Sequence, residues 1–389
     1  MFFLFLYDIF RFSFGFIFVG LHCALMIGLF LEWRRDNRSR AMPVSAETDQ
    51  RFPRVSVIIP VHNEEPHLDK LLQSLGDQDY PEAEFIFIND RSSDNSLEML
   101  RNFVPKGKVQ IISLQENPGP NHKQYALGKG IEAASGDFLL FTDADCEVPS
   151  GWIFAMVKRM SDKQTGVTIG PVFKKSGGKG FFHLYQCFDH AVRYMYLAGS
   201  TGLGAAGGGF GNNLILRRDA LNVIGGYDTV SASPTEDAAL ISRIRSCSHY
   251  RIRSGFGADL FVITGSEQTW KDLINQTLRW NNGGLFSPDP ATRFNFGFLM
   301  ITISMGIIAL PVLFFIPTLW TLSVAVLFSM TMNTIATLKL FGPVLPQKSI
   351  PAYIMQLIFT PIYFTFLTIL GFCRVKIHWK GSRLTTPRS

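Results

Sequence analysis

Charged residues are scarce in this sequence, and long stretches contain none. Asp, Glu, Lys and Arg together make up 17% of the 389 residues, whereas hydrophobic residues make up 47% and include 35 Phe. An average soluble protein is about a quarter charged. The composition therefore excludes a disordered chain and a collagen-like one, and it argues against an ordinary cytosolic enzyme.

Paired cysteines are also missing. The chain has five cysteines, and no two of them form a C-x-x-C pair. An odd, unpaired set excludes a disulfide framework and a cysteine zinc site, and it is typical of a reducing compartment. The cysteines are Cys23, Cys146, Cys187, Cys247 and Cys373.

The first uncharged run lies close to the N-terminus. Residues 12–31 carry no formal charge, and about 20 apolar residues suffice to cross a bilayer core. No small-residue cleavage site follows, so we expect residues 1–31 to be a retained transmembrane signal-anchor. A basic cluster follows between Arg34 and Arg40. By the positive-inside rule it places the N-terminus outside a plasma or inner membrane and the centre of the chain in the cytoplasm.

Two longer uncharged runs lie near the C-terminus. Residues 294–338 are long enough for two spans, with a break expected at Pro311 and Pro317. Residues 349–373 are long enough for one more. We therefore predict about three transmembrane helices within residues 294–373, followed by a basic tail at 374–389. Buried core helices are the alternative, which these lengths disfavour.

The side on which the tail lies is left open. Three crossings after a cytosolic domain would put the tail outside, whereas its basic residues favour the inside. A re-entrant last segment at Pro351 and Pro361, or an earlier segment in the membrane interface, would reconcile the two. Because the basic residues mostly flank apolar runs, we expect the lipid bilayer as a partner and no nucleic acid.

The centre of the chain follows a different pattern. After a basic and polar linker at 32–54, short apolar runs alternate with amphipathic helical patterns. This alternation predicts an α/β domain at 55–290 with a doubly wound, mostly parallel sheet, whose ligands bind at the carboxyl ends of the strands. The expected strands are 55–59, 84–88, 109–113 and 137–141, with helices around 68–75, 96–103 and 122–134.

Polar residues follow three of these strands, at 60–65, 89–94 and 142–145. Asp143 and Asp145 stand two positions apart, so in an extended segment their carboxylates point to the same side. Hard cations such as Mg²⁺ or Mn²⁺ bind carboxylate and phosphate oxygens. By itself, however, a D-x-D pair is more typical of a solvated loop or a helix cap.

The order of the motifs resembles that of membrane-bound family 2 glycosyltransferases, in particular relatives of ceramide glucosyltransferases and of cellulose and hyaluronan synthases. The resemblance extends over residues 55–280. It departs from the family at Asn89, where many members have Asp, and at 379–383, which only approximate a W-x-G-R ending. The six motifs are V-I-I-P-V-H-N-E at 57–64, N-D-R-S-S-D at 89–94, D-A-D at 143–145, G-G-Y-D at 225–228, T-E-D at 235–237 and Q-T-L-R-W at 276–280.

The resemblance implies a GT-A fold, which is Rossmann-like, beside α-helical transmembrane segments. It implies that Asp145, with Asp143, holds Mg²⁺ or Mn²⁺ on the donor diphosphate, and that Asp237 is the general base. The implied nucleotide-sugar ligands are Pro60, Asn63, Glu64, Asp90, Lys123 and Asp143. The residues implied for the acceptor and the diphosphate are Glu236, Gln276, Arg279 and Trp280.

The activity that the resemblance implies is inverting hexosyl transfer from a nucleotide sugar, with UDP expected, to a membrane lipid. One base and one metal-stabilised leaving group support a single displacement, and therefore inversion. A processive polysaccharide synthase is one alternative, because it shares the Q-x-x-R-W motif. A membrane transporter or scaffold is another, although it would need intramembrane charges or an inverted repeat.

Two of the motif assignments have a purely structural alternative. Asp237 precedes the apolar residues 238–241, so it could cap a helix N-terminus. Residues 270–280 have amphipathic spacing, so they could form a helix that lies on the membrane surface.

Overall fold

The computed structural model describes residues 2–41, 52–118, 121–175, 177–178, 180–287, 289–312, 320–346, 350–373, 377–379 and 382–384. The centre of the expected linker (42–51), Pro317 and most of the expected basic tail lie outside these residues. The chain divides into two compact units. The sheet unit comprises Phe30–Lys175 and Gly204–Gly265, and the helical unit comprises Met1–Leu29, Ser176–Leu203 and Ser266–Ser389.

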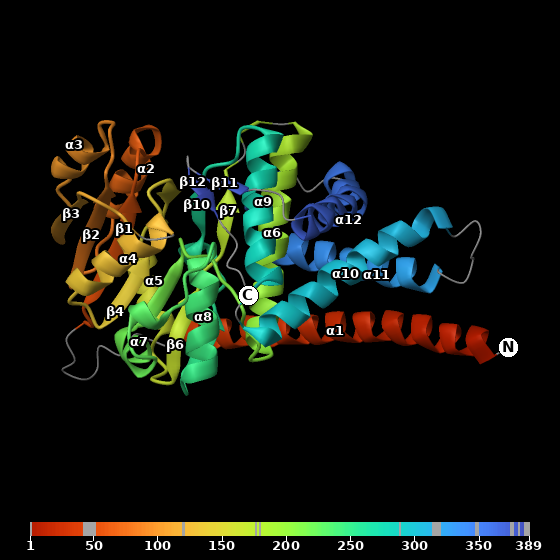
Figure 1. Ribbon diagram of the computed structural model, residues 1–389. Helices are drawn as coiled ribbons and strands as arrows, with labels where there is room; N and C mark the ends of the chain where they lie inside the picture. Colours follow the sequence, from red (N-terminus) through yellow and green to blue (C-terminus); the bar gives the residue numbers. More distant parts are fainter. Residues whose placement is uncertain are drawn as a thin grey trace. The chain divides into compact units, whose positions relative to one another are not determined.

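The sheet unit is built on a seven-stranded sheet with the order β3-β2-β1-β4-β8-β6-β9 (Figure 1). β1 pairs in parallel with β2 and β4, β2 with β3, and β6 with β9, whereas β8 runs antiparallel to β4 and β6. The mostly parallel α/β architecture predicted from the alternation of patterns is therefore confirmed. The strands are β1 (Val55–Val61), β2 (Ala83–Asp90), β3 (Lys108–Leu114), β4 (Phe138–Phe141), β6 (Thr165–Ile169), β8 (Leu214–Arg217) and β9 (Arg251–Ser254).

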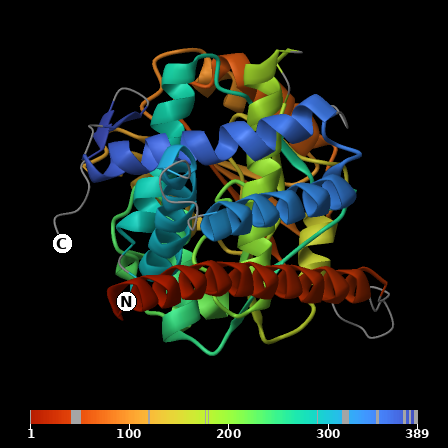
Figure 2. The same ribbon diagram turned by 90° about the vertical axis from the view of Figure 1, so that its right-hand side faces the viewer.

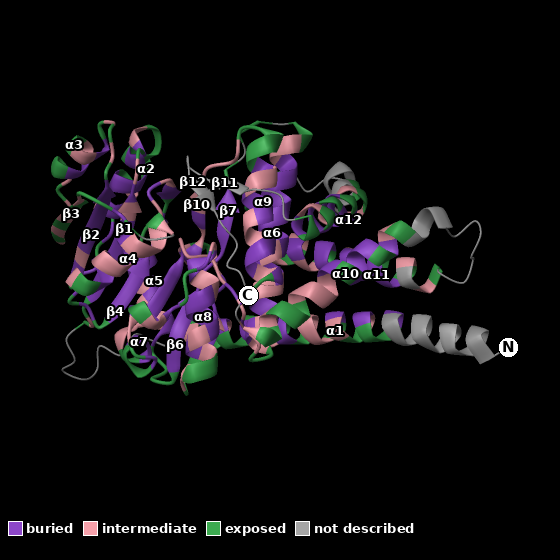
Figure 3. Ribbon diagram, in the orientation of Figure 1, coloured by how far each residue is buried: buried purple, intermediate pink, exposed green. Residues whose placement is uncertain are grey.

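Strand β1 lies in the middle of the core. Its residues Val57, Ile58 and Ile59 are fully buried, so both faces of the strand are covered, as in parallel sheets between helices. The buried leucine face of α2 (Glu65–Gly76) packs into the same core, and Figure 3 shows the buried strands beside the exposed turns of the helices. The other helices of this unit are α3 (Ser96–Arg101), α4 (His122–Ala133), α5 (Trp152–Arg159), α7 (Arg218–Val223) and α8 (Glu236–Cys247), with 3₁₀ turns η1 (Tyr227–Thr229) and η2 (Ala258–Leu260).

A second, three-stranded sheet has the order β5-β10-β7. Its strands are β5 (Cys146–Glu147), β10 (Val262–Thr264) and β7 (Val172–Lys174). β10 runs antiparallel to β5, with Thr264 opposite Cys146, and parallel to β7. The antiparallel pair brings Thr264 next to the turn that follows β4.

The helical unit contains α6, four further helices and the N-terminal part of α1. Figure 2 shows α11 and α12 crossing α6, and both helices contact it. A short hairpin of β11 and β12 follows α12. The elements are α1 (Phe2–Ala41), α6 (Phe181–Gly202), α9 (Trp270–Leu285), α10 (Pro290–Val312), α11 (Trp320–Phe341), α12 (Ile350–Phe372), β11 (Ile377–Trp379) and β12 (Ser382–Leu384).

Three helices in the described part of the chain are long and apolar enough to cross a membrane. They contain Gly15–Ala41, Pro290–Ile308 and Ser323–Phe341, and the apolar stretch Leu357–Phe372 of α12 is shorter. The uncharged run at 294–338 therefore contains two helices, as the sequence predicted, and Pro311 lies at the end of α10.

The start of the expected linker is helical. α1 continues without interruption to Ala41, so residues 32–41 belong to the helix and not to a linker. The sequence from Phe30 to Ala41 contains neither Gly nor Pro, and Pro43 follows, so nothing before that point ends the helix. An ion pair between Arg35 and Glu32 at 2.7 Å adds local support.

Within the helical unit, α1 and α6 approach each other at glycines. A Cβ atom on Gly28 would stand 2.2 Å from the carbonyl oxygen of Gly199, and one on Gly202 would stand 1.9 Å from the carbonyl oxygen of Gly28. Such contacts allow only hydrogen at these positions. This close approach of small residues is typical of helix pairs in membranes.

Candidate active site

The loops after β1 and β2 are tied together at the carboxyl ends of these neighbouring strands. Asn63 adopts a left-handed backbone conformation (φ 54°), which Asn tolerates better than most residues. Its side-chain Oδ1 accepts a hydrogen bond from the backbone N of Ser93 at 2.8 Å, and its own N donates to Ser92 Oγ at 3.1 Å. Pro60 lies within β1, and the buried Glu64 donates its backbone N–H to Ser96 Oγ at 2.9 Å.

Asp90 ends β2 and is only 5% exposed. Its Oδ1 accepts from Arg91 Nε, and its Oδ2 accepts from Asn117 Nδ2, both at 2.8 Å. Asn117 also donates to the backbone oxygen of His122, and its Oδ1 is buried without a hydrogen-bond partner among the described residues. Asn117 carries no motif, and sequence reasoning missed it. Asn89, where the family usually has Asp, is buried and accepts from the backbone N of Ser92 at 3.3 Å.

Lys123, in the first turn of α4, connects two of the predicted site residues. Its Nζ lies 2.7 Å from Asp143 Oδ1 and 3.3 Å from Glu236 Oε1. Asn121 caps α4 by accepting from the N–H of Gln124, and its Nδ2 lies 3.5 Å from Glu236 Oε2. The N-terminus of α4 and the first residue of α8 thus meet at one cluster of charges.

Asp143 and Asp145 do not lie in an extended segment. The N–H of Cys146 bonds back to the oxygen of Asp143 at 3.1 Å, so the D-x-D residues form a tight turn between β4 and β5. The expectation based on side-chain alternation along a strand is therefore wrong here, because it holds only for extended backbone. The two carboxylates have different partners, since Asp143 pairs with Lys123 and Asp145 Oδ2 accepts from Thr264 Oγ1 at 2.9 Å.

Asp237 lies in the first turn of α8, and the N-cap position belongs to Thr235. The N-cap alternative for Asp237 is therefore wrong. Its Oδ2 accepts from the backbone N of Gly211 at 2.9 Å, and its Oδ1 accepts from the N of Ala238 at 2.8 Å. A Cβ atom on Gly211 would stand 3.1 Å from the Asp237 Cβ. The glycine-containing loop before β8 therefore fixes this carboxylate, a contact that the motifs did not reveal.

Cys146 follows the D-x-D turn and is fully buried. Burial, together with the charges of Asp145 and Asp143, raises the pKa of its thiol well above the usual range. The thiol therefore stays protonated at neutral pH. It is a packing residue, as its buried position beside Asn212 also indicates.

The Q-x-x-R-W residues lie on α9 in the helical unit. Gln276 is buried and donates from Nε2 to Glu267 Oε1 at 2.5 Å. The guanidinium carbon of Arg193 lies 5.1 Å from the centre of the Trp280 ring. Arg193 is also paired with Asp189 at 2.7 Å. Such a cation–π contact orients the indole ring. Arg193 and Asp189, both on α6, carry no motif and were not predicted.

The donor chemistry for a cation is limited to a few oxygens. In the described part of the chain, no group of three or more His, Cys, Asp or Glu residues could hold a metal ion. Asp143 and Asp145 supply carboxylate oxygens at the turn after β4. Such a pair fits Mg²⁺ or Mn²⁺ only where phosphate oxygens and water complete the shell.

The mostly parallel α/β sheet, with acidic residues at the carboxyl ends of β2 and β4, has the architecture of the GT-A glycosyltransferase fold. Residues 16–388 match glycosyl transferase family 21, and the chain belongs to this family. The fold is also that of the mannosyltransferase PcManGT from Pyrobaculum calidifontis in complex with GDP-Man and Mn²⁺. That structure has a TM-score of 0.51 and 18% sequence identity, and the match covers 92% of this chain and 99% of that chain.

Two curated relatives are similar to this chain in sequence over part of their length. The chain is 27% identical over 278 residues to a probable glycosyltransferase YdaM of Bacillus subtilis, over 68% of this chain and 63% of that protein. It is 27% identical over 249 residues to a poly-beta-1,6-N-acetyl-D-glucosamine synthase of Staphylococcus epidermidis, over 63% of this chain and 58% of that protein. The chain thus spans about three fifths of the length of these relatives. The closer relationship to ceramide glucosyltransferases stays a prediction.

Proposed function

We propose that this chain is a metal-dependent, inverting hexosyltransferase that moves a sugar from a nucleotide sugar, with UDP as the expected nucleotide, to a membrane lipid. The observation that carries the proposal is the ionic cluster in which Lys123 links Asp143 with Glu236, the residue next to Asp237. One side chain thus joins a candidate metal ligand to the helix that carries the candidate base.

The nucleotide is expected at the carboxyl ends of β1 and β2. Ligands of doubly wound sheets bind at this edge, where Pro60 lies near the end of β1, Asp90 ends β2, and Asn63 and Glu64 follow β1. The hydrogen-bonded pair of Asp90 and Asn117 offers polar atoms to a base or a ribose. We assign base and ribose binding to these residues.

The diphosphate is expected next to Lys123, Asp143 and Asp145. The two carboxylates suffice for a divalent cation, because Mg²⁺ usually takes one or two carboxylates and completes its shell with phosphate oxygens and water. Held by Asp143 and Asp145, such a cation would neutralise charge that develops on the leaving diphosphate. Lys123 adds a second positive charge at the same place.

The chemical step proposed is a single displacement. The acceptor hydroxyl oxygen bonds to the anomeric carbon of the sugar while the bond from that carbon to the diphosphate oxygen breaks. The hydroxyl proton passes to Asp237, whose carboxylate the Gly211 N–H holds in place. We assign contacts with the acceptor or the diphosphate to Glu236, Gln276, Arg279 and Trp280. Attack from the face opposite the leaving group inverts the anomeric centre.

A membrane lipid is the proposed acceptor because three helices in the described part of the chain are long and apolar enough to span a bilayer. The basic residues after the first span, between Arg34 and Arg40, support a cytoplasmic catalytic domain. The second candidate is a processive polysaccharide synthase. The similarity to the poly-beta-1,6-N-acetyl-D-glucosamine synthase favours it.

One experiment tests the proposal against this alternative. Membranes that contain the full-length protein are supplied with a panel of radiolabelled sugar nucleotides, with and without EDTA. We expect label in a single lipid-extractable product, lost in EDTA and restored by Mn²⁺ or Mg²⁺. Label in a long or insoluble saccharide would favour the synthase. Transfer at the full rate in EDTA would contradict the metal assignment, and an Asp237→Asn variant controls for endogenous transferases.

A further inference from the structure

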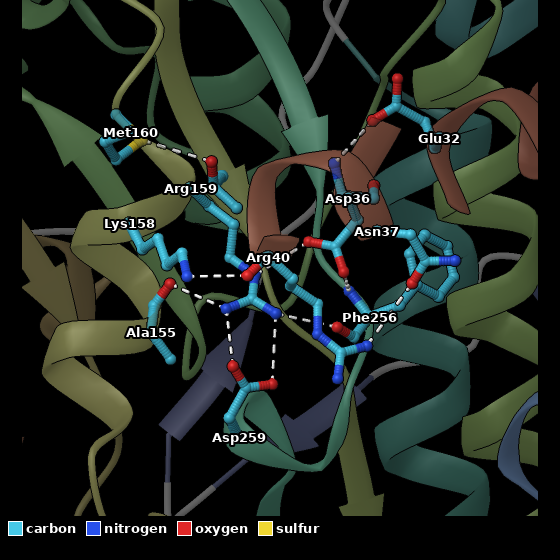
Figure 4. A network of polar contacts seen from close by, with 12 residues as sticks. Glu32, Asp36, Asn37, Arg40, Ala155, Lys158, Arg159, Met160, Phe256 and Asp259 are labelled. Carbon is cyan, nitrogen blue, oxygen red and sulfur yellow. Dashed lines mark hydrogen bonds and ion pairs between the residues drawn. The ribbon is translucent and has the colours of Figure 1, made fainter. Parts of the chain in front are cut away.

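A buried network of ion pairs in the sheet unit takes no part in the proposed chemistry (Figure 4). At its centre is Arg159, the last residue of α5, whose side chain is 3% exposed. Its Nε donates to Asp36 Oδ1 at 2.8 Å, and its Nη1 and Nη2 donate to the two carboxylate oxygens of Asp259 at 2.8 and 3.1 Å. The remaining donors reach the backbone oxygens of Ala155 and Phe256 at 3.0 and 2.9 Å.

The end of α1 supplies the other half of this network. Asp36, with a side chain 2% exposed, also accepts from the N–H of Phe256 at 3.0 Å. One turn earlier on the same helix face, Glu32 accepts from the N–H of Ser254 at 3.2 Å. Lys158 donates to the backbone oxygen of Arg40 at 2.7 Å. Glu32 and Asp36 are both buried, and each is hydrogen-bonded to the segment 254–256.

Residues 254–256 begin a segment, 254–260, that leads to the candidate metal site. This segment ends one residue before the short strand β10, whose last residue is Thr264. Thr264 stands opposite Cys146 and donates its hydroxyl to Asp145 at 2.9 Å. A shift of the segment that Arg159 and Asp36 hold would therefore move the hydroxyl that orients Asp145. Asn213 fixes the same segment independently, by donating to Leu260 O at 2.7 Å, so loss of Arg159 contacts would loosen β10 only in part.

We propose that Asp36 and Arg159 are positioning residues for the diphosphate edge of the site, and that the end of α1 orients the Asp145 carboxylate through segment 254–260 and Thr264. This inference rests on the proposed function, because the direction of Asp145 matters only if a metal–diphosphate binds there. The last turns of α1 then help to position the residues of the catalytic site. If α1 were only a membrane tether, substitutions at Asp36 would leave nucleotide binding unchanged.

The experiment measures binding of UDP with Mn²⁺ to the purified full-length protein in detergent, by titration calorimetry, with donor KM and kcat alongside. Thr264→Val removes the hydroxyl on Asp145, and we expect about 10- to 100-fold weaker binding, as for other groups that orient metal ligands. Asp36→Asn should weaken binding in the same direction but less, and raise KM more than it lowers kcat. Asp79→Asn is the matched control, because it breaks an exposed pair with Lys106. It should change nothing.

All titrations are run well below the thermal unfolding midpoint of each variant, so that a loss of stability alone leaves the dissociation constant unchanged. If Thr264→Val weakens binding while Asp36→Asn binds like the wild type, the network only stabilises the fold and the inference is overturned. If Asp36→Asn does not fold, Asp259→Asn decides in its place, because that carboxylate is 40% exposed and Asp36 remains paired. If the wild type binds neither UDP nor GDP with Mn²⁺, the proposed function itself fails.

Discussion

The ammonium group of Lys123 lies 2.7 Å from a carboxylate oxygen of Asp143. This cation therefore stands beside one of the two proposed metal ligands. A divalent cation that binds Asp143 would repel the ammonium group, which would then be available for a phosphate oxygen. The pair is a natural starting point for tests of the donor site.

Replacing Lys123 by Met should weaken the binding of UDP with Mn²⁺. A hydrogen bond to a charged group contributes about 1.5–3 kcal/mol, which corresponds to a loss of affinity of about 10- to 100-fold. Lys123→Arg keeps the charge and should retain part of the affinity. Titration calorimetry on the purified variants checks this. Wild-type affinity in Lys123→Met would show that the lysine does not reach the diphosphate.

Asp237 and Asp145 should differ in the step that they affect. Asp237→Asn keeps an oxygen that can accept from Gly211 N–H, but it cannot take up a proton. Turnover should fall by a factor of about 10² to 10⁴, with little change in affinity for the nucleoside diphosphate. Asp145→Asn should weaken metal-dependent nucleotide binding as well as turnover.

Measurements of turnover and of UDP–Mn²⁺ binding on both variants distinguish these roles. Near wild-type turnover in Asp237→Asn would leave the mechanism without its base. A loss of nucleotide binding as large as that of Asp145→Asn would place Asp237 on the donor side of the reacting sugar.

Glu84, at the end of β2 away from Asp90, should make the stability of the fold depend on pH. Burial opposes its ionisation, but hydrogen bonds from Ser56 Oγ and from the N–H and hydroxyl of Ser135 outweigh this and lower the pKa of the carboxyl below its usual 4.5. A carboxyl with a lowered pKa in the folded state stabilises the fold above the unfolded-state pKa. That contribution is lost as the pH falls through the folded-state pKa.

Glu84→Gln should therefore lower the unfolding midpoint at pH 7, and the difference from the wild type should shrink between about pH 5 and pH 3. Thermal unfolding of the full-length protein in detergent at several pH values measures this difference. A difference that stays constant down to the lowest pH would mean that the hydrogen bonds do not depend on the charge of Glu84.

Local patterns in the sequence were sufficient for strands β1 to β4 and helices α2 to α4 of the sheet unit. The runs at 55–59 and 85–88 are buried on both faces, and a continuous apolar run is the sequence signal of such burial. Turn geometry was not predictable in the same way. At the D-x-D segment the hydrogen bond from Cys146 N–H to Asp143 O replaces extended backbone, and it separates the partners of Asp143 and Asp145.

Contacts between distant positions could not be predicted. Arg159 has no motif, and its partners Asp36 and Asp259 lie 123 and 100 positions away in the chain. Thr264 and Gly211 likewise hold Asp145 and Asp237 only because the fold brings them together. The motifs identified residues with side-chain chemistry, whereas the backbone N–H groups and hydroxyls that position those residues became visible only in the folded chain.

The contact of α1 with α6 gives the sharpest test of the helical unit. A methyl group on Gly28 would stand 2.2 Å from the carbonyl oxygen of Gly199 and 2.9 Å from the side chain of Leu203. A backbone atom cannot move aside as a side chain can, so Gly28→Ala should force the two helices apart. We expect the free energy of unfolding to fall by about 1–3 kcal/mol, as for other overpacked sites. Gly20→Ala, on the same helix, meets nothing within 4 Å. It should be neutral or slightly stabilising, because Ala favours helix more than Gly. The unfolding midpoints of both full-length variants in detergent provide the comparison, and equal midpoints would contradict the close approach at Gly28.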